Sequence, residues 1–168
     1  MRFRLKRFES QACFECLAVT LPDLLLAQRQ PDHTMNTINI EWKDSYLFND
    51  VLIDRQHQEI FTLANAVIHA ADQSAFRLAA LELYRYMRKH FSDEKALMRE
   101  INFPDYKNHI ELHNSLLSRF KAIVQEIVLN GHWNRDDIHS FMVHDYGKHL
   151  EEEDAKIAVH NRMCMSAA

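Results

Sequence analysis

The sequence predicts an all-α protein: an antiparallel, up-down four-helix bundle with an N-terminal extension. Glycine and proline are rare, with 2 and 3 residues in a chain of 168, whereas strand-rich folds need many turn residues. From Ile53 to about Val159, apolar residues recur in four blocks at the spacing of amphipathic helices. Four such helices with short connections pack most simply as an antiparallel bundle.

The first two helices are predicted from their apolar faces. The first runs from about Asp54 to Ala71 and the second from roughly Ser74 to Glu100. Residues three and four apart lie on one face of a helix, so each set is expected to point into the core. The expected faces are Ile53, His57, Ile60, Phe61, Ala64, Val67 and Ile68 in the first helix, and Leu78, Leu81, Leu83, Tyr86, Met87, Leu97 and Met98 in the second.

Turn residues delimit the third and fourth helices. Pro104 suits the first turn of the third helix, which is expected to run to Asn130. Gly131 then provides a left-handed stop. Asn134 is expected to cap the fourth helix, and the acidic residues of Asn134–Asp137 suit the positive end of its dipole.

Residues 1–34 differ from the rest and are expected to form a poorly structured extension to a helical domain at 35–168. They include Cys13 and Cys16 in a CFEC motif, which lacks the second CxxC of a zinc site, so incidental thiols are favoured. Alternatively, Met35 is the natural start. The extension is also a candidate contact for a protein partner.

Charge and hydropathy exclude several classes of protein. The formal net charge is −4 and no stripe of Lys and Arg is visible, which argues against a nucleic-acid partner. No apolar run approaches the roughly 20 residues of a membrane span. The basic start MRFRLKRF makes a poor signal peptide because Pro22 and Asp23 interrupt the apolar stretch that follows. We therefore expect a cytoplasmic monomer or small homo-oligomer, not a membrane protein.

Two pairs of polar residues stand four positions apart: His90 with Glu94, and His109 with His113. On a helix such residues have Cβ atoms about 5–6 Å apart, so each pair can address one point. Each pair could instead occupy a solvated face or be satisfied within the core. The neighbouring residues are apolar, however, and burying imidazoles and a carboxylate costs several kcal/mol unless something pairs with them. A metal is one such partner, and His57, His149 and Asp154 supply matching groups in the other blocks.

The segments WKDSYLFNDVLIDRQH, HFSDEKALM, FPDYKNHIELH and KHLEEED together resemble the hemerythrin family, specifically the bacterial single-domain hemerythrins. The resemblance covers roughly Ile38 to Ala158. The order H…HxxxE…HxxxH…HxxxxD over four helices is specific, whereas ferritin-like di-iron bundles use Glu-x-x-His pairs, which this sequence lacks.

This resemblance implies a centre of two iron ions. Glu94 and Asp154 would bridge the metals, one iron would take three histidines, and the other would take His57 and His90. The implied ligands are His57, His90, Glu94, His109, His113, His149 and Asp154.

Coordination counting suggests what such a centre does. Five imidazoles, two bridging carboxylates and one oxo or hydroxo bridge fill eleven of the twelve positions of two octahedral ions. The open position would lie on the two-histidine iron, and the family's ligand is O2. We therefore expect a protein of O2 carriage, storage or sensing rather than an enzyme. The alternatives are a di-iron peroxidase, oxidase or nitric-oxide-handling enzyme, an iron- or oxygen-sensing regulatory module, and a zinc-bound or metal-free bundle.

Three residues are expected to line the O2 pocket. Phe91 and Leu150 match apolar positions of the family. Asp145 and Tyr146 depart from the Trp-Leu that is usual there, and Gly147 adds a residue that weakens a helix by about 1 kcal/mol. The Tyr146 phenol either touches bound O2, prolonging or shortening its stay, or points between helices and touches nothing reactive.

Other polar residues are predicted to have lesser roles. Asp54 and Gln56 flank His57 and either orient ligands or, for Asp54, cap the helix. His144 is the one further histidine within possible reach of the site. The histidines outside the pattern are expected on the surface or in loops: His33, His69, His132, His139, His144 and His160.

Overall fold

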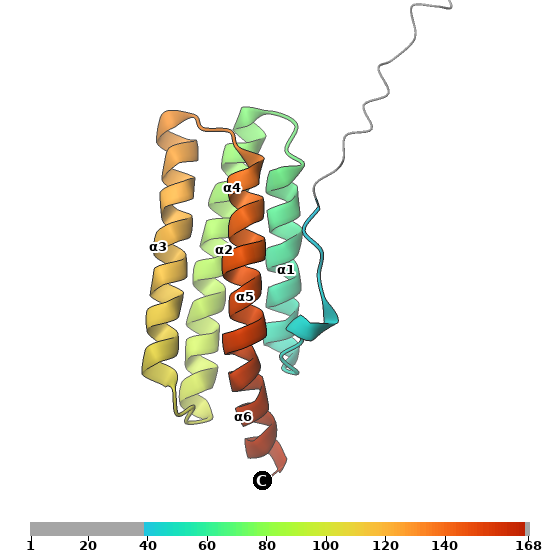
Figure 1. Cartoon of the computed structure of the whole chain (residues 1–168), viewed down its shortest axis with the longest axis vertical. Coiled ribbons are helices and arrows are strands. Elements are labelled where there is room, and N and C mark those ends of the chain that lie inside the picture. Colours follow the sequence, from blue (N-terminus) through green and yellow to red (C-terminus); the bar gives the residue numbers. More distant parts are fainter. Residues whose placement is uncertain (1–38, 167–168) are drawn as a thin grey trace, which may run out of the picture. The chain divides into compact units, whose positions relative to one another are not determined.

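The computed structural model describes residues 39–166. The predicted extension at 1–34, its CFEC motif and the boundary at Met35 lie outside the described residues. Within the described part, no strand occurs and four antiparallel helical columns pack side by side (Figure 1). The first three are α1 (Val51–Ile68), α2 (Gln73–Glu100) and α3 (Tyr106–Asn130), and the fourth begins at Arg135. The all-α, four-helix prediction is confirmed.

The fourth column changes its helical type four times without breaking. It consists of α4 (Arg135–Ser140), the π-helix η2 (Phe141–Tyr146), α5 (Gly147–His149), the π-helix η3 (Leu150–Asp154) and α6 (Ala155–Ser166). The backbone is right-handed helical at each junction, including Gly147 at φ −60° and ψ −40°. The apolar spacing predicted a single helix here, without the two π segments.

Gly147 sits where the last column meets the 3-10 helix η1 (Asp44–Tyr46). A Cβ at position 147 would lie 3.2 Å from Tyr46 Oη and 3.1 Å from the Met142 carbonyl oxygen. The glycine therefore admits a close approach of Tyr46, and the helix continues through it.

Asp50 caps α1, whereas Asp54 stabilises the turn that precedes the helix. Asp50 is the N-cap, and its Oδ1 accepts hydrogen bonds from the backbone N–H groups of Leu52 and Ile53, both at 3.0 Å. Asp54 reaches backwards and accepts from the N–H groups of Phe48 (2.6 Å) and Asn49 (3.0 Å). Asp54 thus holds the preceding turn, where Asn49 has φ +67°. It neither caps the helix nor orients a site residue, contrary to both expectations.

The predicted caps at Gly131 and Asn134 are confirmed, whereas α1 runs from Val51 to Ile68 instead of from about Asp54 to Ala71. Gly131 caps α3 at φ +67°, and Asn134 caps α4 by accepting from the Asp136 N–H at 3.0 Å. Pro104 does not lie in the first turn of α3, because that helix begins at Tyr106. The chain instead makes a turn that buries Phe103 in the core, and Phe103 N–H donates to the Met98 carbonyl at 2.8 Å.

The buried faces follow the predicted spacing closely. All seven residues predicted for α1 are buried. In α2, Leu78 is 61% exposed, so its predicted burial was wrong, and Phe76 and Ala80 face the core instead. Two apolar clusters form the core, one containing Ile60, Met87 and Phe91, the other containing Ile53, Met98 and Phe103. A layer of polar residues lies between these clusters along α1 and α2, because His57 and Glu94 fall between their members in sequence.

None of the helices described in residues 39–166 is both long enough and apolar enough to span a membrane.

Candidate metal centre

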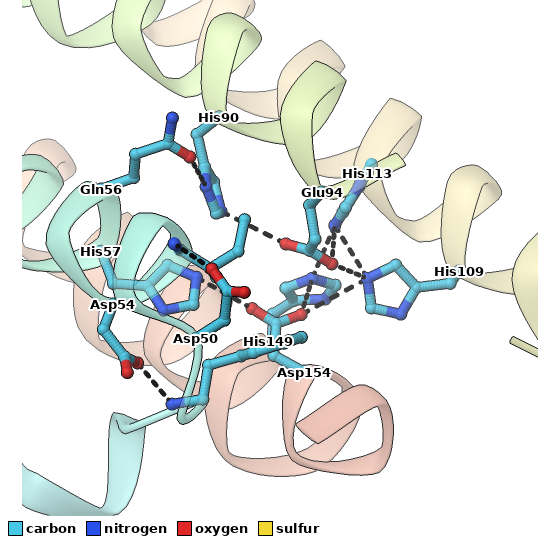
Figure 2. Close-up of polar contacts among 12 residues, drawn as sticks. Asp50, Asp54, Gln56, His57, His90, Glu94, His109, His113, His149 and Asp154 are labelled. Atoms are coloured by element: carbon cyan, nitrogen blue, oxygen red, sulfur yellow. Dashed lines mark hydrogen bonds and ion pairs between the residues drawn. The ribbon is translucent and has the colours of Figure 1, made fainter. Parts of the chain in front are cut away.

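Seven polar side chains converge in this layer from all four columns (Figure 2). None is more than 5% exposed. One comes from α1, two from α2, two from α3 and two from the last column. They are the seven residues singled out from the sequence: His57, His90, Glu94, His109, His113, His149 and Asp154.

The two pairs spaced by four residues meet as helical geometry requires. His90 Nε2 lies 3.3 Å from Glu94 Oε2 on α2. His109 Nε2 lies 2.9 Å from His113 Nε2 on α3. Both pairs therefore direct their ligand atoms at common points, as expected for i and i+4 positions.

The pair His149 and Asp154 meets for a different reason. Residues five apart on an α-helix point about 140° away from each other. The intervening segment η3 is π-helical, with hydrogen bonds closing between residues i and i+5, so positions five apart share a face. His149 Nε2 consequently lies 2.9 Å from Asp154 Oδ1.

The seven residues form two groups, in each of which ligand atoms lie within 4.8 Å of one another. One group contains His109, His113, His149 and Asp154. The other contains His57, His90, Glu94 and Asp154. This division matches the three-histidine and two-histidine sets that the family resemblance implied.

Each carboxylate directs one oxygen at each group. Glu94 Oε2 approaches His90, while Oε1 lies 2.9 Å from His109 Nε2 and 3.6 Å from His113 Nε2. Asp154 Oδ2 lies 3.4 Å from His57 Nε2, while Oδ1 lies 3.3 Å from His109 Nε2. Two carboxylates that each span two donor groups have the arrangement of bridging ligands.

Burial and the charges of neighbouring groups lower the pKa of some of these residues and raise the pKa of others. Burial, reinforced by neighbouring histidines, lowers the pKa of His90 and His113 well below the usual range. Burial and the nearby Asp154 raise the pKa of Glu94. Burial opposes ionisation of Asp154, but the adjacent histidines, with His149 foremost, hold its pKa well below the usual range. Burial likewise opposes the charged form of His109, yet Asp154 and Glu94 raise its pKa to about 9.

These residues fit two bound cations. Several of their buried atoms have no hydrogen-bond partner of good geometry among the described residues: both ring nitrogens of His57, His90 Nε2, and both carboxylate oxygens of Glu94 and Asp154. An unpaired buried polar group costs about 1–3 kcal/mol, and a cation would satisfy several such groups at once. Imidazole and carboxylate donors without thiolate suit iron and also accommodate zinc or manganese.

Residues 50–159 match the family model described as the hemerythrin HHE cation binding domain. The chain belongs to the hemerythrin family. A bacteriohemerythrin of Campylobacter jejuni is 28% identical over 115 residues, covering 65% of this chain and 85% of that protein. Hemerythrin subunit 2 of Golfingia vulgaris is 32% identical over 77 residues, covering 45% and 63%. The crystal structure of a hemerythrin mutant has the same fold, with a TM-score of 0.63 at 21% identity over 70% of this chain and 92% of that one.

In this hemerythrin-family chain, aromatic rings pack against the candidate ligands. Phe91 stacks on His113, with ring centroids 3.9 Å apart and an interplanar angle of 13°. The Tyr146 ring centroid lies 6.5 Å from that of His57 and 6.4 Å from that of Phe91. Leu150 is buried beside them in the same apolar cluster. The three residues predicted to line a ligand pocket thus occupy one buried region next to the candidate ligands.

Tyr146 is completely buried, and its hydroxyl has no hydrogen-bond partner among the described residues. Burial, together with the charges of Asp154 and Glu94, raises the pKa of the phenol well above its usual value. Its sequence neighbour Asp145 points outward and pairs with Arg119. The unusual Asp-Tyr pair therefore places only the phenol beside the site.

Gln56, one of the two residues beside His57 expected to orient ligands, contacts a candidate ligand on another helix. Its Oε1 lies 3.2 Å from His90 Nδ1 on α2 (Figure 2). His144, the other residue considered within reach, is exposed. The available signal for Gln56 was its place one residue before His57 on the core side of α1, where a buried amide needs a partner.

Proposed function

We propose that this chain binds O2 at a non-haem di-iron centre, for oxygen carriage, storage or sensing. The observation that carries the proposal is the arrangement of Glu94 and Asp154, each with one oxygen directed at each donor group. Membership of the hemerythrin family, a family of oxygen-binding proteins rather than enzymes, supports the same function. When bound, two irons would supply an open coordination position and the electrons with which O2 is captured.

The residues of the chain have separate tasks in this proposal. His109, His113 and His149 would hold one iron, and His57 and His90 would hold the other. Glu94 and Asp154, each with one oxygen directed at each donor group, would serve both ions. The group with three histidines offers one more imidazole than the group with two, so an open position would lie on the side of His57 and His90.

The surroundings of that open position control access to it. Phe91 and Leu150 are buried apolar residues that exclude water from the region between the groups. Low local polarity strengthens the electrostatic interactions of whatever ligand enters. The Tyr146 hydroxyl has no hydrogen-bond partner among the described residues, and it can donate to an entering ligand.

One observation favours a second candidate function. A buried phenol without a partner, beside ionisable groups, can also promote loss of a reduced oxygen species, as an oxidase, peroxidase or nitric-oxide-handling enzyme would need. Rapid mixing of the reduced, iron-loaded protein with O2 separates these functions. An absorption band that persists and disappears reversibly under vacuum supports oxygen binding, whereas prompt oxidation with turnover of a reducing substrate supports the enzyme.

The metal content tests the proposal directly. The purified protein is expected to carry about two irons per chain, and the Asp154→Asn variant is expected to lose at least half of them. The matched control is Glu152→Gln, an exposed neighbour on the same helical segment. Iron-free protein, or full iron retention by Asp154→Asn, would overturn the proposal.

A further inference from the structure

His90 differs from the other four site histidines in its outer contacts. Its Nδ1 lies 3.2 Å from Gln56 Oε1, across the interface between α1 and α2. Among the hydrogen bonds of the described residues, no other site histidine contacts a side chain outside the seven. The Nδ1 atoms of His57 and His113 are buried without any partner. His90, on the two-histidine side, is therefore the one site histidine whose outer ring nitrogen contacts a side chain beyond the seven among the described residues.

The contact extends to the surface through two more residues. Gln56 is 3% exposed, and its Nε2 donates to Asp93 Oδ2 at 2.6 Å. The same carboxylate oxygen accepts from Lys89 Nζ, also at 2.6 Å. Lys89 is exposed to solvent, so an unbroken chain of hydrogen bonds runs from Lys89 through Asp93 and Gln56 to His90.

The direction of this chain fixes the protonation of His90. An ionised carboxylate only accepts hydrogen bonds, so Gln56 must present its NH2 group to Asp93 and its carbonyl oxygen to His90. Lys89 Nζ and Gln56 Nε2 both donate to the same Asp93 oxygen, which is therefore the acceptor at the outer end of the chain. The carbonyl oxygen in turn requires a proton on His90 Nδ1. His90 Nε2 is then left with its lone pair, and this is the atom that faces Glu94 and the donor group.

We propose that Gln56 is a positioning residue that, anchored by Asp93 and Lys89, selects the metal-binding tautomer of His90 and strengthens it as a ligand. The proposal rests on the proposed di-iron function and adds an asymmetry to it. The chain of hydrogen bonds supports the iron that would carry the open position and not its neighbour. An outer hydrogen bond of this kind raises the basicity of a ligating imidazole, and its loss typically costs 10- to 100-fold in metal affinity.

A stronger imidazole donor stabilises the ferric ion more than the ferrous ion. Removing the support should therefore raise the reduction potential of the centre. A tenfold larger loss of affinity for the ferric than for the ferrous ion corresponds to a rise of about 59 mV for a one-electron couple. A residue that merely filled space at position 56 would not shift the potential in this way.

The test compares Gln56→Met with Gln58→Met. Methionine keeps the length of the side chain but removes its hydrogen bonds, and Gln58 is exposed on the same helix, so it controls for the substitution itself. Asp93→Asn is the third variant, because it removes the charge while leaving an acceptor for Gln56. Zinc-loaded protein provides a diamagnetic sample for NMR, and iron-loaded protein provides the potential.

The zinc-loaded wild type and Gln58→Met are expected to show a slowly exchanging His90 Nδ1 proton, and this proton should exchange faster with solvent in Gln56→Met because its acceptor is gone. Gln56→Met should bind one zinc ion 10- to 100-fold more weakly than the control, and its iron centre should have a higher potential. Asp93→Asn should keep the proton and raise the potential by less. Unchanged zinc affinity and potential in Gln56→Met would overturn the proposal, as would an Nε2 proton on His90. Failure of the wild type to bind iron would refute the di-iron function, while the zinc experiment would still decide the tautomer.

Discussion

The Tyr146→Phe substitution would isolate one atom of the site. It removes the phenol oxygen and leaves the ring among His57, Phe61 and Phe91, whose centroids lie 6.2–6.5 Å away. The hydroxyl is fully buried without a partner among the described residues, and such a group costs about 1–3 kcal/mol. The metal-free Tyr146→Phe protein should therefore be more stable than the wild type by about 1 kcal/mol. For a domain of this size, that corresponds to a rise in Tm of about 4 °C.

In the iron-loaded protein, the same substitution should weaken the binding of an anion at the open position. If the phenol donates to an anion in the open position, its removal loses a hydrogen bond to a charged group, worth about 1.5–3 kcal/mol. Azide, a small anion, should then bind the oxidised Tyr146→Phe protein about 10- to 150-fold more weakly. Thermal unfolding of the metal-free protein and optical titration of the iron-loaded protein with azide measure the two effects.

Tyr84→Phe is the matched control, because Tyr84 is half-buried and packs against Phe120 away from the site. It should change azide affinity by less than twofold. If Tyr146→Phe instead destabilises the metal-free protein, the hydroxyl makes a stabilising contact and its burial carries no net cost. If azide affinity is unchanged, the phenol does not face the open position.

Three further predictions concern titration, bridging and a turn. The raised pKa of His109 stabilises the metal-free fold below pH 6.5, and this contribution of about 3 kcal/mol should be lost as the pH rises through about 9. Urea unfolding between pH 6.5 and 10 should show this decline, which bound metal abolishes because the metal displaces the proton. Zinc binding, measured by calorimetry, should weaken at least tenfold in Asp154→Asn but not in Glu152→Gln; equal affinities would contradict the bridging role. Gly131→Ala should cost about 1–2 kcal/mol, since φ is +67° and a Cβ would lie 2.9 Å from Gln73 Nε2; unchanged stability in urea would contradict this.

Helical periodicity predicted much of the fold and the positions of the polar residues. The spacing of Ile53, Ile60, Ala64 and Val67 identified the buried face of α1, and all four are fully buried. His57 falls on that same face, so its burial follows from its register alone. Because a helix repeats every 3.6 residues, local spacing determines which side chains share a face.

Contacts between helices were harder to predict, because the axial register of two helices depends on how their side chains pack. Gln56 illustrates this: its partner His90 is 34 positions away on α2, and no local pattern connects them. Leu78 illustrates a related limit. Its neighbours Phe76 and Ala80 complete the buried stripe of α2, whereas Leu78 is exposed.

The π-helix η3 is the clearest case in which regular α-helical spacing does not predict the geometry of the site. His149 and Asp154 stand five residues apart, a spacing at which a regular α-helix would direct Asp154 about 140° away from the site. A π turn has poorer hydrogen-bond geometry than an α turn and is retained mostly at functional positions. Here the retained turn places the Asp154 carboxylate between the two donor groups. The spacing itself was the signal available in the sequence: the other two pairs are spaced by four, and a buried pair spaced by five requires an added residue in the helix.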